Sequence, residues 1–251
     1  MKKRTIEIFF AAIICIFLAA LLIPGVVSFF GPKEVVKWTA DFNAISVDGR
    51  THLPEDWKFR KKPGTPSAVF SIEKDDKEGI SYLRMEADKA SGSLVTRIDN
   101  IDLEDTPFLK WRWRVKTLPG GADGRDKKRD DQAIGIYVGS GSLLNNKSVS
   151  YRWDTDTPRG AEGNCLYGGG TVKVKWFTLR NAKDAEGGKW ITEERNVAED
   201  FRNAWGFYPE KVYLSVSCNS QYTGTKAVAD LAWIELVAAS SGDKAPQEGE
   251  E

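Results

Sequence analysis

Short β-like runs separated by turns fill the middle of the chain. From Trp38 to Val237, runs rich in Val, Ile, Trp, Tyr and Phe alternate with Gly, Pro, Asp and Asn. This spacing is typical of an antiparallel β-sandwich or jelly roll. The predicted strands are 37–43, 68–73, 81–87, 92–98, 108–116, 132–138, 148–153, 171–180, 189–194, 211–218 and 227–237. The pattern therefore predicts one all-β domain over residues 37–238.

A single helix interrupts this pattern in the C-terminal half of the chain. Val197, Phe201 and Trp205 recur at helical spacing, which indicates one apolar face. Asn196 is a suitable N-cap residue, and Gly206 is a suitable residue to end the helix. We expect this short helix to pack its apolar face against the sandwich.

The N-terminal sequence predicts that the protein is attached to a membrane. A basic head is followed by an apolar run, 8–30, that carries no charge. A transmembrane helix needs about 20 apolar residues and a signal-peptide core roughly 7–15, so the run favours a retained single-pass anchor at 1–30. The positive-inside rule then places a tether at 31–36 and the sandwich in the periplasm or outside the cell. The alternative is cleavage near Ser28 and secretion. The acidic tail at 239–251 is predicted to be disordered.

Charge and composition exclude several functions. Lys plus Arg and Asp plus Glu both number 36, so the formal net charge is zero and a nucleic-acid partner is not expected. The one histidine, His52, rules out multi-histidine metal sites, and nothing indicates a cofactor. Cys15 lies in the apolar segment. Cys165 and Cys218 could form one disulfide, but their spacing in the sequence does not decide whether they do.

The strand at 110–116 places its tryptophans on one face, predicted to be core, and four cations on the other. Arg112 and Arg114 are the central two of these cations. Adjacent cations repel unless carboxylates or an anionic ligand offset them. We favour ion pairs with Glu193, Glu194 or Asp200, and the alternative is a concave sheet face that binds acidic or hydroxyl-rich groups.

Several short motifs occur in the order found in one bacterial exported family. They are LP at 53–54 with WKF at 57–59, ASGSL at 90–94, FLKWRWRV at 108–115 with LP at 118–119 and DD at 130–131, YRW at 151–153, W at 190 with EERNV at 193–197 and EDFR at 199–202, and TG at 223–224 with AWI at 232–234. Over about residues 41–237 the chain resembles the family called domain of unknown function 3047. The resemblance implies a jelly-roll-like sandwich similar to carbohydrate-binding modules. It implies no established activity, so no catalytic residue is carried over. The family often has acidic residues where this chain reads CNSQ at 218–221, which puts any carboxylate-dependent site there in doubt.

Candidate ligand-binding residues come from these motifs and from the cationic strand. They are Arg112, Arg114, Tyr151, Arg152, Trp153, Glu194 and Arg195. Tyr151, Trp153, Trp176 and Trp190 are either stacking platforms for sugar rings or, as is commoner for aromatics in strands, core residues.

Acidic residues supply weaker candidates for a metal site and for catalysis. Asp130 and Asp131 supply only part of a calcium shell, and the alternative is that they cap a turn or pair with arginine. Glu193 and Glu194 point to opposite faces of a strand, so glycoside hydrolysis would need a further carboxylate, such as Asp131 or Asp154, across the sheet.

Three functions remain open at this point. The first is a membrane-anchored, non-catalytic binding module for envelope saccharide, which predicts an open groove lined by Arg112, Arg114 and at least one exposed aromatic. The alternative is a structural or accessory subunit of a larger membrane assembly, which predicts a flat apolar patch. The second alternative is a glycoside hydrolase or lyase, which predicts two carboxylates facing each other in the groove.

Overall fold

The computed structural model describes residues 34–42, 54, 56–142, 145–209 and 211–238. The predicted anchor at 1–30, the tail, Cys15 and His52 lie outside these residues. Within the described ranges, no helix is long and apolar enough to cross a membrane. The strands of the described part belong to one compact unit, Val35–Ala239, and Glu34 is the one described residue of the remaining segments.

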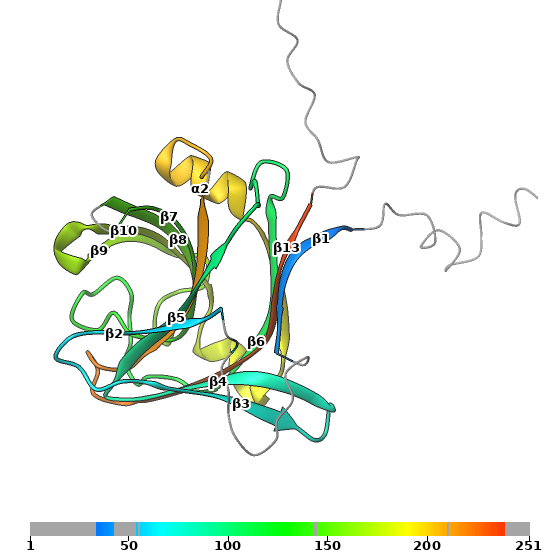
Figure 1. The fold of residues 1–251 in the computed structure, drawn as a ribbon. Helices are drawn as coiled ribbons and strands as arrows, with labels where there is room; N and C mark the ends of the chain where they lie inside the picture. Colours follow the sequence, from blue (N-terminus) through cyan, green and yellow to red (C-terminus); the bar gives the residue numbers. More distant parts are fainter. Residues whose placement is uncertain (1–33, 43–53, 55, 143–144, 210, 239–251) are drawn as a thin grey trace, which may run out of the picture. The chain divides into compact units, whose positions relative to one another are not determined.

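Two β-sheets form the fold (Figure 1). The six-stranded sheet has the order β11 (Ile191–Asn196), β6 (Phe108–Thr117), β13 (Lys226–Val237), β4 (Ile80–Asp88) and β3 (Val69–Asp75), and β1 (Val36–Asp41) also pairs with β13. The seven-stranded sheet has the order β2 (Lys58–Lys61), β5 (Ser91–Ile98), β12 (Val212–Asn219), β7 (Gln132–Ser142), β8 (Asn145–Trp153), β10 (Val172–Arg180) and β9 (Glu162–Tyr167). Neighbouring strands are antiparallel except β8 and β10. The predicted all-β sandwich is confirmed.

Aromatic side chains from both sheets meet in the centre of the sandwich. Trp111 and Trp113 of β6 are fully buried, as alternation along that strand predicted. Trp111 stacks on Tyr151 of β8 with ring centroids 5.2 Å apart, and Trp113 meets Trp153 of β8 edge-on at 5.5 Å. Aromatic pairs at these separations add to the burial energy of the rings. These ring contacts hold strand β6 of one sheet against strand β8 of the other across the core.

The predicted helix is present as α2 (Val197–Trp205). The side chain of Asn196 accepts a hydrogen bond of 3.0 Å from the backbone N–H of Glu199. Gly206 ends the helix with φ of 82°, a conformation that glycine adopts without strain. Phe201 is fully buried, so the apolar face packs against the sandwich as expected.

Two strands of the structure have no counterpart among those expected from the sequence. They are β2 and β9, which form the two edges of the seven-stranded sheet (Figure 1). Every residue of β2 is exposed, and β9 contains no fully buried residue. An edge strand with little core contact lacks the apolar alternation by which strands are recognised.

The two described cysteines are free. Cys218 of β12 is fully buried, whereas Cys165 lies on β9 at the sheet edge. Burial raises the pKa of both thiols, that of Cys165 to about 11. A buried thiol that stays protonated is a poor nucleophile, so the structure supports a packing role for Cys218.

Candidate functional site

A groove of about 1300 Å³ crosses the outer face of the seven-stranded sheet. Its lining residues come from β2 at one edge, from β9 and β10 at the other, and from β5, β12, β7 and β8 between them. Figure 1 shows β2 and β9 at opposite edges of the seven-stranded sheet, and residues of both strands line this hollow. We call this hollow the groove. It is larger than the pocket of about 510 Å³ on the six-stranded sheet, and a large concave surface is the usual place for a binding site.

Polar side chains form the floor of the groove because of strand alternation. Along β12 the buried Val212, Leu214 and Val216 face the core, so the residues between them face outward. The floor and its ends carry hydroxyl and amide groups from Ser93, Asn146, Ser148, Ser215, Ser217, Asn219 and Gln221 and phenol groups from Tyr137, Tyr167, Tyr213 and Tyr222. The groove thus presents many neutral donors and acceptors beside aromatic rings.

Glycines let two tyrosine rings approach the sheet closely. A Cβ atom at Gly135 would lie 2.8 Å from Cε2 of Tyr137, and one at Gly139 would lie 3.1 Å from Cδ2 and Cε2 of Tyr213. Contacts this short show that each ring lies against the glycine backbone of β7. Both tyrosines are only partly buried, so part of each ring remains open to the groove.

Hydrogen bonds hold these phenols in place. The Tyr213 hydroxyl accepts from Nδ2 of Asn146 at 2.7 Å and donates to the carbonyl of Gly141 at 2.8 Å. The Tyr137 hydroxyl accepts from Nε2 of Gln132 at 2.8 Å. Burial raises the pKa of Tyr137 to about 12 and also raises that of Tyr213. The two phenols are therefore neutral near pH 7.

A buried ion cluster lies under one end of the groove. Arg152 of β8 is 1% exposed, and it donates to Asp130 at 2.7 Å and to Asp154 at 3.2 Å. Asp130 also accepts a hydrogen bond of 2.8 Å from the Tyr167 hydroxyl. Burial disfavours the Arg152 cation, but Asp154 and Asp130 outweigh this and hold the arginine pKa well above its usual range. For the carboxyl group of Asp154, burial has the opposite effect on the pKa and raises it. Arg152 supports the groove from below and is closed to solvent.

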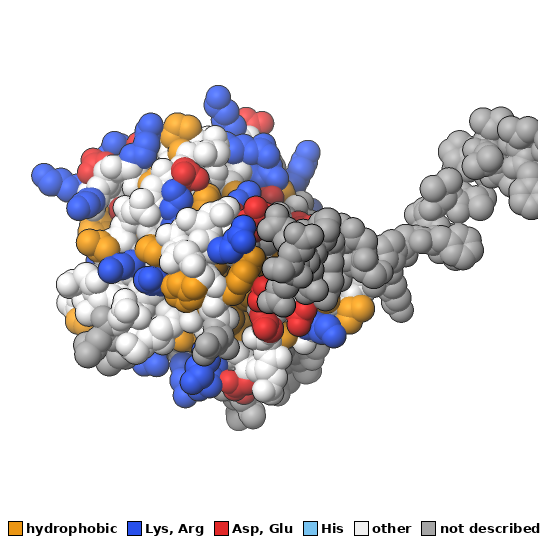
Figure 2. Space-filling model, turned by 90° about the horizontal axis from the view of Figure 1, so that it is seen from above, with side chains coloured by type: hydrophobic (Ala, Val, Ile, Leu, Met, Phe, Trp, Pro, Cys, Tyr) orange, Lys and Arg blue, Asp and Glu red, His pale blue; other side chains and the backbone are white. Residues whose placement is uncertain are grey.

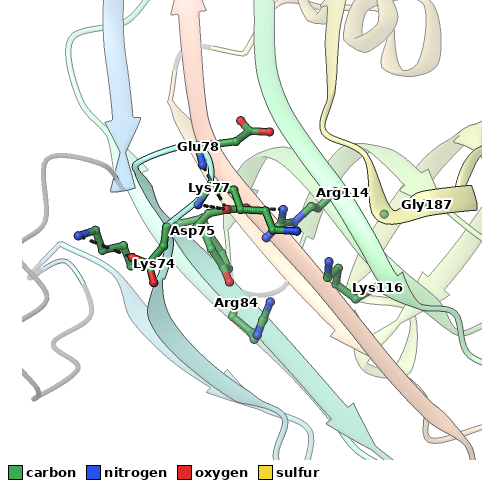
Figure 3. Close-up of a pocket in the computed structure, with 11 residues that line it drawn as sticks. Lys74, Asp75, Lys77, Glu78, Arg84, Arg114, Lys116 and Gly187 are labelled. Atoms are coloured by element: carbon green, nitrogen blue, oxygen red, sulfur yellow. Dashed lines mark hydrogen bonds and ion pairs between the residues drawn. The ribbon is translucent and has the colours of Figure 1, made fainter.

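Arg112 and Arg114 lie on the other sheet, on its outer face. There Arg114 borders a pocket of about 510 Å³, the ion-pair pocket, which Figure 3 shows, whereas Arg112 does not line it. Arg114 donates to Asp75 and to Asp230, both at 2.7 Å, and Arg112 donates to Glu78 at 2.7 Å. Ion pairing of these cations was expected, and it is found. For these two arginines the carboxylates come from β3, its following turn and β13, and not from Glu193, Glu194 or Asp200 as expected, whereas Lys110 of the same strand does pair with Glu194.

The remaining predicted residues occupy other places. Tyr151 and Trp153 are fully buried between the sheets, so neither ring is open to a ligand in this structure. Arg195 pairs with Asp200 at 2.7 Å, and Glu194 pairs with Lys110 at 2.9 Å. The structure therefore does not bring the predicted residues together in one site.

Two further predicted stacking platforms are also largely covered. Trp176 is 3% exposed beneath the groove, with the guanidinium carbon of Arg152 5.4 Å from its ring centroid. Trp190 is partly buried on the six-stranded sheet, where the guanidinium carbon of Arg114 lies 4.2 Å from its ring centroid. These tryptophans hold arginines in position.

Asp130 and Asp131 both have protein partners. Asp130 binds Arg152, and Asp131 is fully buried and accepts a hydrogen bond of 2.7 Å from the backbone N–H of Thr223. Among the residues that the structure describes, no group of three or more His, Cys, Asp or Glu is placed to hold a metal ion. Three of the four carboxylate oxygens of this pair thus accept hydrogen bonds from protein groups, and the buried Oδ1 of Asp131 has no partner among the described residues.

Sequence reasoning passed over the groove, although one signal for it was available. The stretch 212–219 alternates apolar residues with Tyr213, Ser215, Ser217 and Asn219, so one face of that strand is hydroxyl- and amide-rich. A polar face on a central strand indicates either solvent or a ligand. No comparable signal marks the two edge strands.

Three solved structures illustrate what this chain is similar to. A family 11 carbohydrate-binding module of the cellulase Lic26A-Cel5E of Clostridium thermocellum shares 10% identity, with 83% of this chain and 96% of that chain covered and a TM-score of 0.38. An exo-β-agarase shares 10% identity over 87% of this chain and 29% of its own, with a TM-score of 0.36. The enzymatically active domain of tailspike protein 4 of bacteriophage CBA120 shares 8% identity over 73% of this chain and 19% of its own, with a TM-score of 0.35. The chain spans about a fifth of that tailspike chain. Such distant likenesses carry no argument about function.

Sequence comparison gives the family. No curated protein matches the chain. The model of DUF3047, described as a protein of unknown function, matches residues 55–235, which include every described strand except β1 and the end of β13. The sandwich described above thus coincides with the matched region, and this chain belongs to the DUF3047 family.

Proposed function

We propose that this domain is a non-catalytic module that binds a saccharide chain in the groove. The observation that carries the proposal is the groove itself, which is open, about 1300 Å³ in volume, and lined by tyrosine rings beside hydroxyl and amide groups. Saccharides present both hydroxyl groups and weakly polar ring faces, so they need donors, acceptors and aromatic surface together. The floor of the groove supplies all three.

The neutral state of the phenols supports this proposal. Because Tyr137 and Tyr213 have raised pKa values, their hydroxyls both donate and accept hydrogen bonds near pH 7. Their rings are held by glycine contacts and hydrogen bonds before a ligand arrives. Binding then costs little side-chain ordering.

The carboxylates of the groove favour binding over hydrolysis. Among described residues, Asp56, Asp99 and Asp130 line it. Asp99 pairs with Arg97 at 2.7 Å, and Asp130 is held by Arg152. A glycosidase needs one carboxylic acid poised to protonate the leaving group, whereas these two carboxylates are already engaged with cations. We therefore propose a binding role without catalysis.

We also propose that the domain is held at the cell membrane by residues 1–30 and faces the periplasm or the exterior. The support is the long uncharged run at 8–30 after a basic head. A saccharide-binding domain in that position would meet the envelope polymers of the cell. Protease treatment of intact spheroplasts tests the topology, since an external domain is degraded and a cytoplasmic one is protected.

An accessory-subunit role has less support from the surface. The exposed large hydrophobic residues of the described part are Val35, Val36, Phe59, Val69, Leu166, Phe207 and Tyr222. They come from several strands and loops. The face seen in Figure 2 shows Lys and Arg side chains spread over it, with hydrophobic side chains in small areas between them. Protein interfaces of stable assemblies need larger continuous apolar areas.

Tyr213→Ala is expected to lower glycan affinity about tenfold or more, since a central aromatic contributes a large share of binding energy. The full-length protein is first applied to a glycan array, and isothermal titration with the best ligand then compares the variants. Tyr213→Phe keeps the ring and separates its contribution from that of the hydroxyl. Arg112→Ala, on the opposite sheet, is the matched control and should bind normally. The proposal fails if no glycan binds, or if Tyr213→Ala binds as tightly as the unaltered protein.

A further inference from the structure

One wall of the groove is strongly basic. Strand β2 and the residue after it read Lys58, Phe59, Arg60, Lys61 and Lys62. In the antiparallel pairing with β5, Lys58 lies opposite Val95 and Arg60 opposite Ser93. Val95 and Ser93 both line the groove, and directly opposed residues share a face of the sheet. Lys58 and Arg60 therefore flank the groove, while Phe59 turns to the inner side, where it meets Phe70 at 5.8 Å between ring centroids.

The charges of this wall are not neutralised within the described part of the protein. There, Lys58, Arg60 and Lys61 form no ion pair, and all three are exposed. Lys62 places its Nζ atom 2.9 Å from the Tyr222 hydroxyl and 4.3 Å from the centre of that ring. The contrast with the six-stranded sheet is clear, since Arg114 there has two carboxylate partners. Among the described residues, no carboxylate pairs with Lys58, Arg60 or Lys61, so these cations are available to a group on the ligand.

The wall facing β2 is uncharged. Its lining residues are Leu166, Tyr167, Gly168, Val172 and Val174. A ligand in the groove thus meets cations along one side, apolar and phenolic surface along the other, and hydroxyl groups beneath. Of the three carboxylates in the lining, Asp99 is paired with Arg97 and Asp130 with Arg152, and Asp56 is the third. Since the whole chain has no net charge, this asymmetry is a local feature of the groove.

We infer that the groove selects acidic saccharide chains, bearing carboxylate groups, over neutral ones. The inference rests on the proposed saccharide-binding function and adds the class of ligand. The guanidinium of Arg60 matches a carboxylate with two parallel hydrogen bonds, whereas Lys58 acts as a compact point charge. Alternate residues of a strand lie about 7 Å apart, so the two cations meet different carboxylates of one chain.

The test compares polymers that differ only in charge. Polygalacturonate and alginate, each beside its methyl-esterified form, are titrated into the full-length protein at low ionic strength. The acidic forms are expected to bind at least about tenfold more tightly than the esters, and added salt should shrink this preference. The double variant Lys58→Ser/Arg60→Ser should lower the affinity for the acidic forms to that for the esters. Lys77→Ser/Lys116→Ser makes the same change of charge on the other sheet and should leave the preference intact.

The remaining outcomes are decisive. Equal binding of acidic and esterified polymers overturns the inference and leaves saccharide binding standing. Binding of polyphosphate as tight as that of the acidic polymers, unaffected by Tyr213→Ala, shows a plain charge effect and also overturns the inference. Failure of both polymer forms, and of every glycan on the array, removes the proposed function itself.

Discussion

Arg152→Met is expected to lower the free energy of unfolding by about 3–5 kcal/mol at neutral pH. The arginine is 1% exposed and lies between Asp130 and Asp154, which are also buried. Methionine fills much of the volume but leaves two carboxylates without a cation. A buried charge that loses its partner retains its full desolvation cost. Urea unfolding of the full-length protein measures the loss.

The size of this loss is expected to depend on pH. Burial already raises the pKa of Asp154 in the folded protein, and the positive charge of Arg152 opposes that rise. Without Arg152 the folded-state pKa of Asp154 rises further, while the unfolded-state value stays near its ordinary value of about 3.9. A raised carboxyl pKa destabilises the folded state above the unfolded value, and the penalty is absent below it. The deficit should therefore be largest near pH 7 and shrink as the pH falls towards about 4.

A matched substitution in the same sheet controls for this result. Arg97 pairs with Asp99 at 2.7 Å, but both side chains are more than 60% exposed. Arg97→Met should change the stability by less than about 1 kcal/mol at any pH. An Arg152→Met deficit that is constant with pH, or as small as that of Arg97→Met, would contradict the assigned role of the buried cluster.

Asp230→Ala is expected to lower the free energy of unfolding by about 3 kcal/mol. The fully buried carboxylate of Asp230 accepts hydrogen bonds from Arg84 at 2.8 and 3.0 Å and from Arg114 at 2.7 Å. Burial lowers the pKa of Arg114, but its bonds to Asp230 and Asp75 outweigh this and raise the pKa overall. Arg84 of β4 and Arg114 of β6 lie on either side of β13, which carries Asp230, so alanine removes the carboxylate that the two cations share and leaves only Arg114 with a second partner, Asp75.

A double-mutant cycle isolates the ion pair from the loss of packing. Asp230→Ala and Arg84→Ala are measured alone and together by chemical denaturation. We expect the double variant to be more stable than the sum of the single effects predicts, since the second change removes a cation that the first left unpaired. Asp230→Asn keeps the shape and one acceptor oxygen and should fall between the alanine variant and the unaltered protein. Strict additivity of the two single effects would rule out the coupling.

The sequence predicted those parts of the fold that local chemistry determines. Alternation in 110–116 placed Trp111 and Trp113 in the core, because a strand buries every second residue. Helical periodicity with Asn196 and Gly206 at the ends gave α2 with its bounds. Each of these signals lies within about a dozen neighbouring residues. They can therefore be recognised in a single sequence without knowledge of the tertiary structure.

The parts that were missed depend on distant segments. Arg114 pairs with Asp230, 116 residues later in the chain, and the sequence gives no means of choosing it over the nearer Glu193 or Glu194. Tyr151 and Trp153 alternate as core residues do, yet alternation alone does not say which face of β8 turns inward. The groove is harder still, because its walls are edge strands and its hollow arises from the curvature of the whole sheet.

The position of the groove walls has a consequence for how this family can vary. Side chains of β2 and β9 contribute little to the core, and those of β2 are all exposed. On the proposed function, substitutions there are expected to change the preferred ligand while costing little stability. Tyr137 and Tyr213, whose rings lie against glycine, and the buried Arg152 are expected to tolerate few replacements. The proposed specificity could then change during evolution through the two edge strands while the rest of the sandwich stays the same. A library randomised at Lys58, Arg60 and Leu166 would exploit the same separation in the laboratory, yielding folded proteins with new glycan preferences.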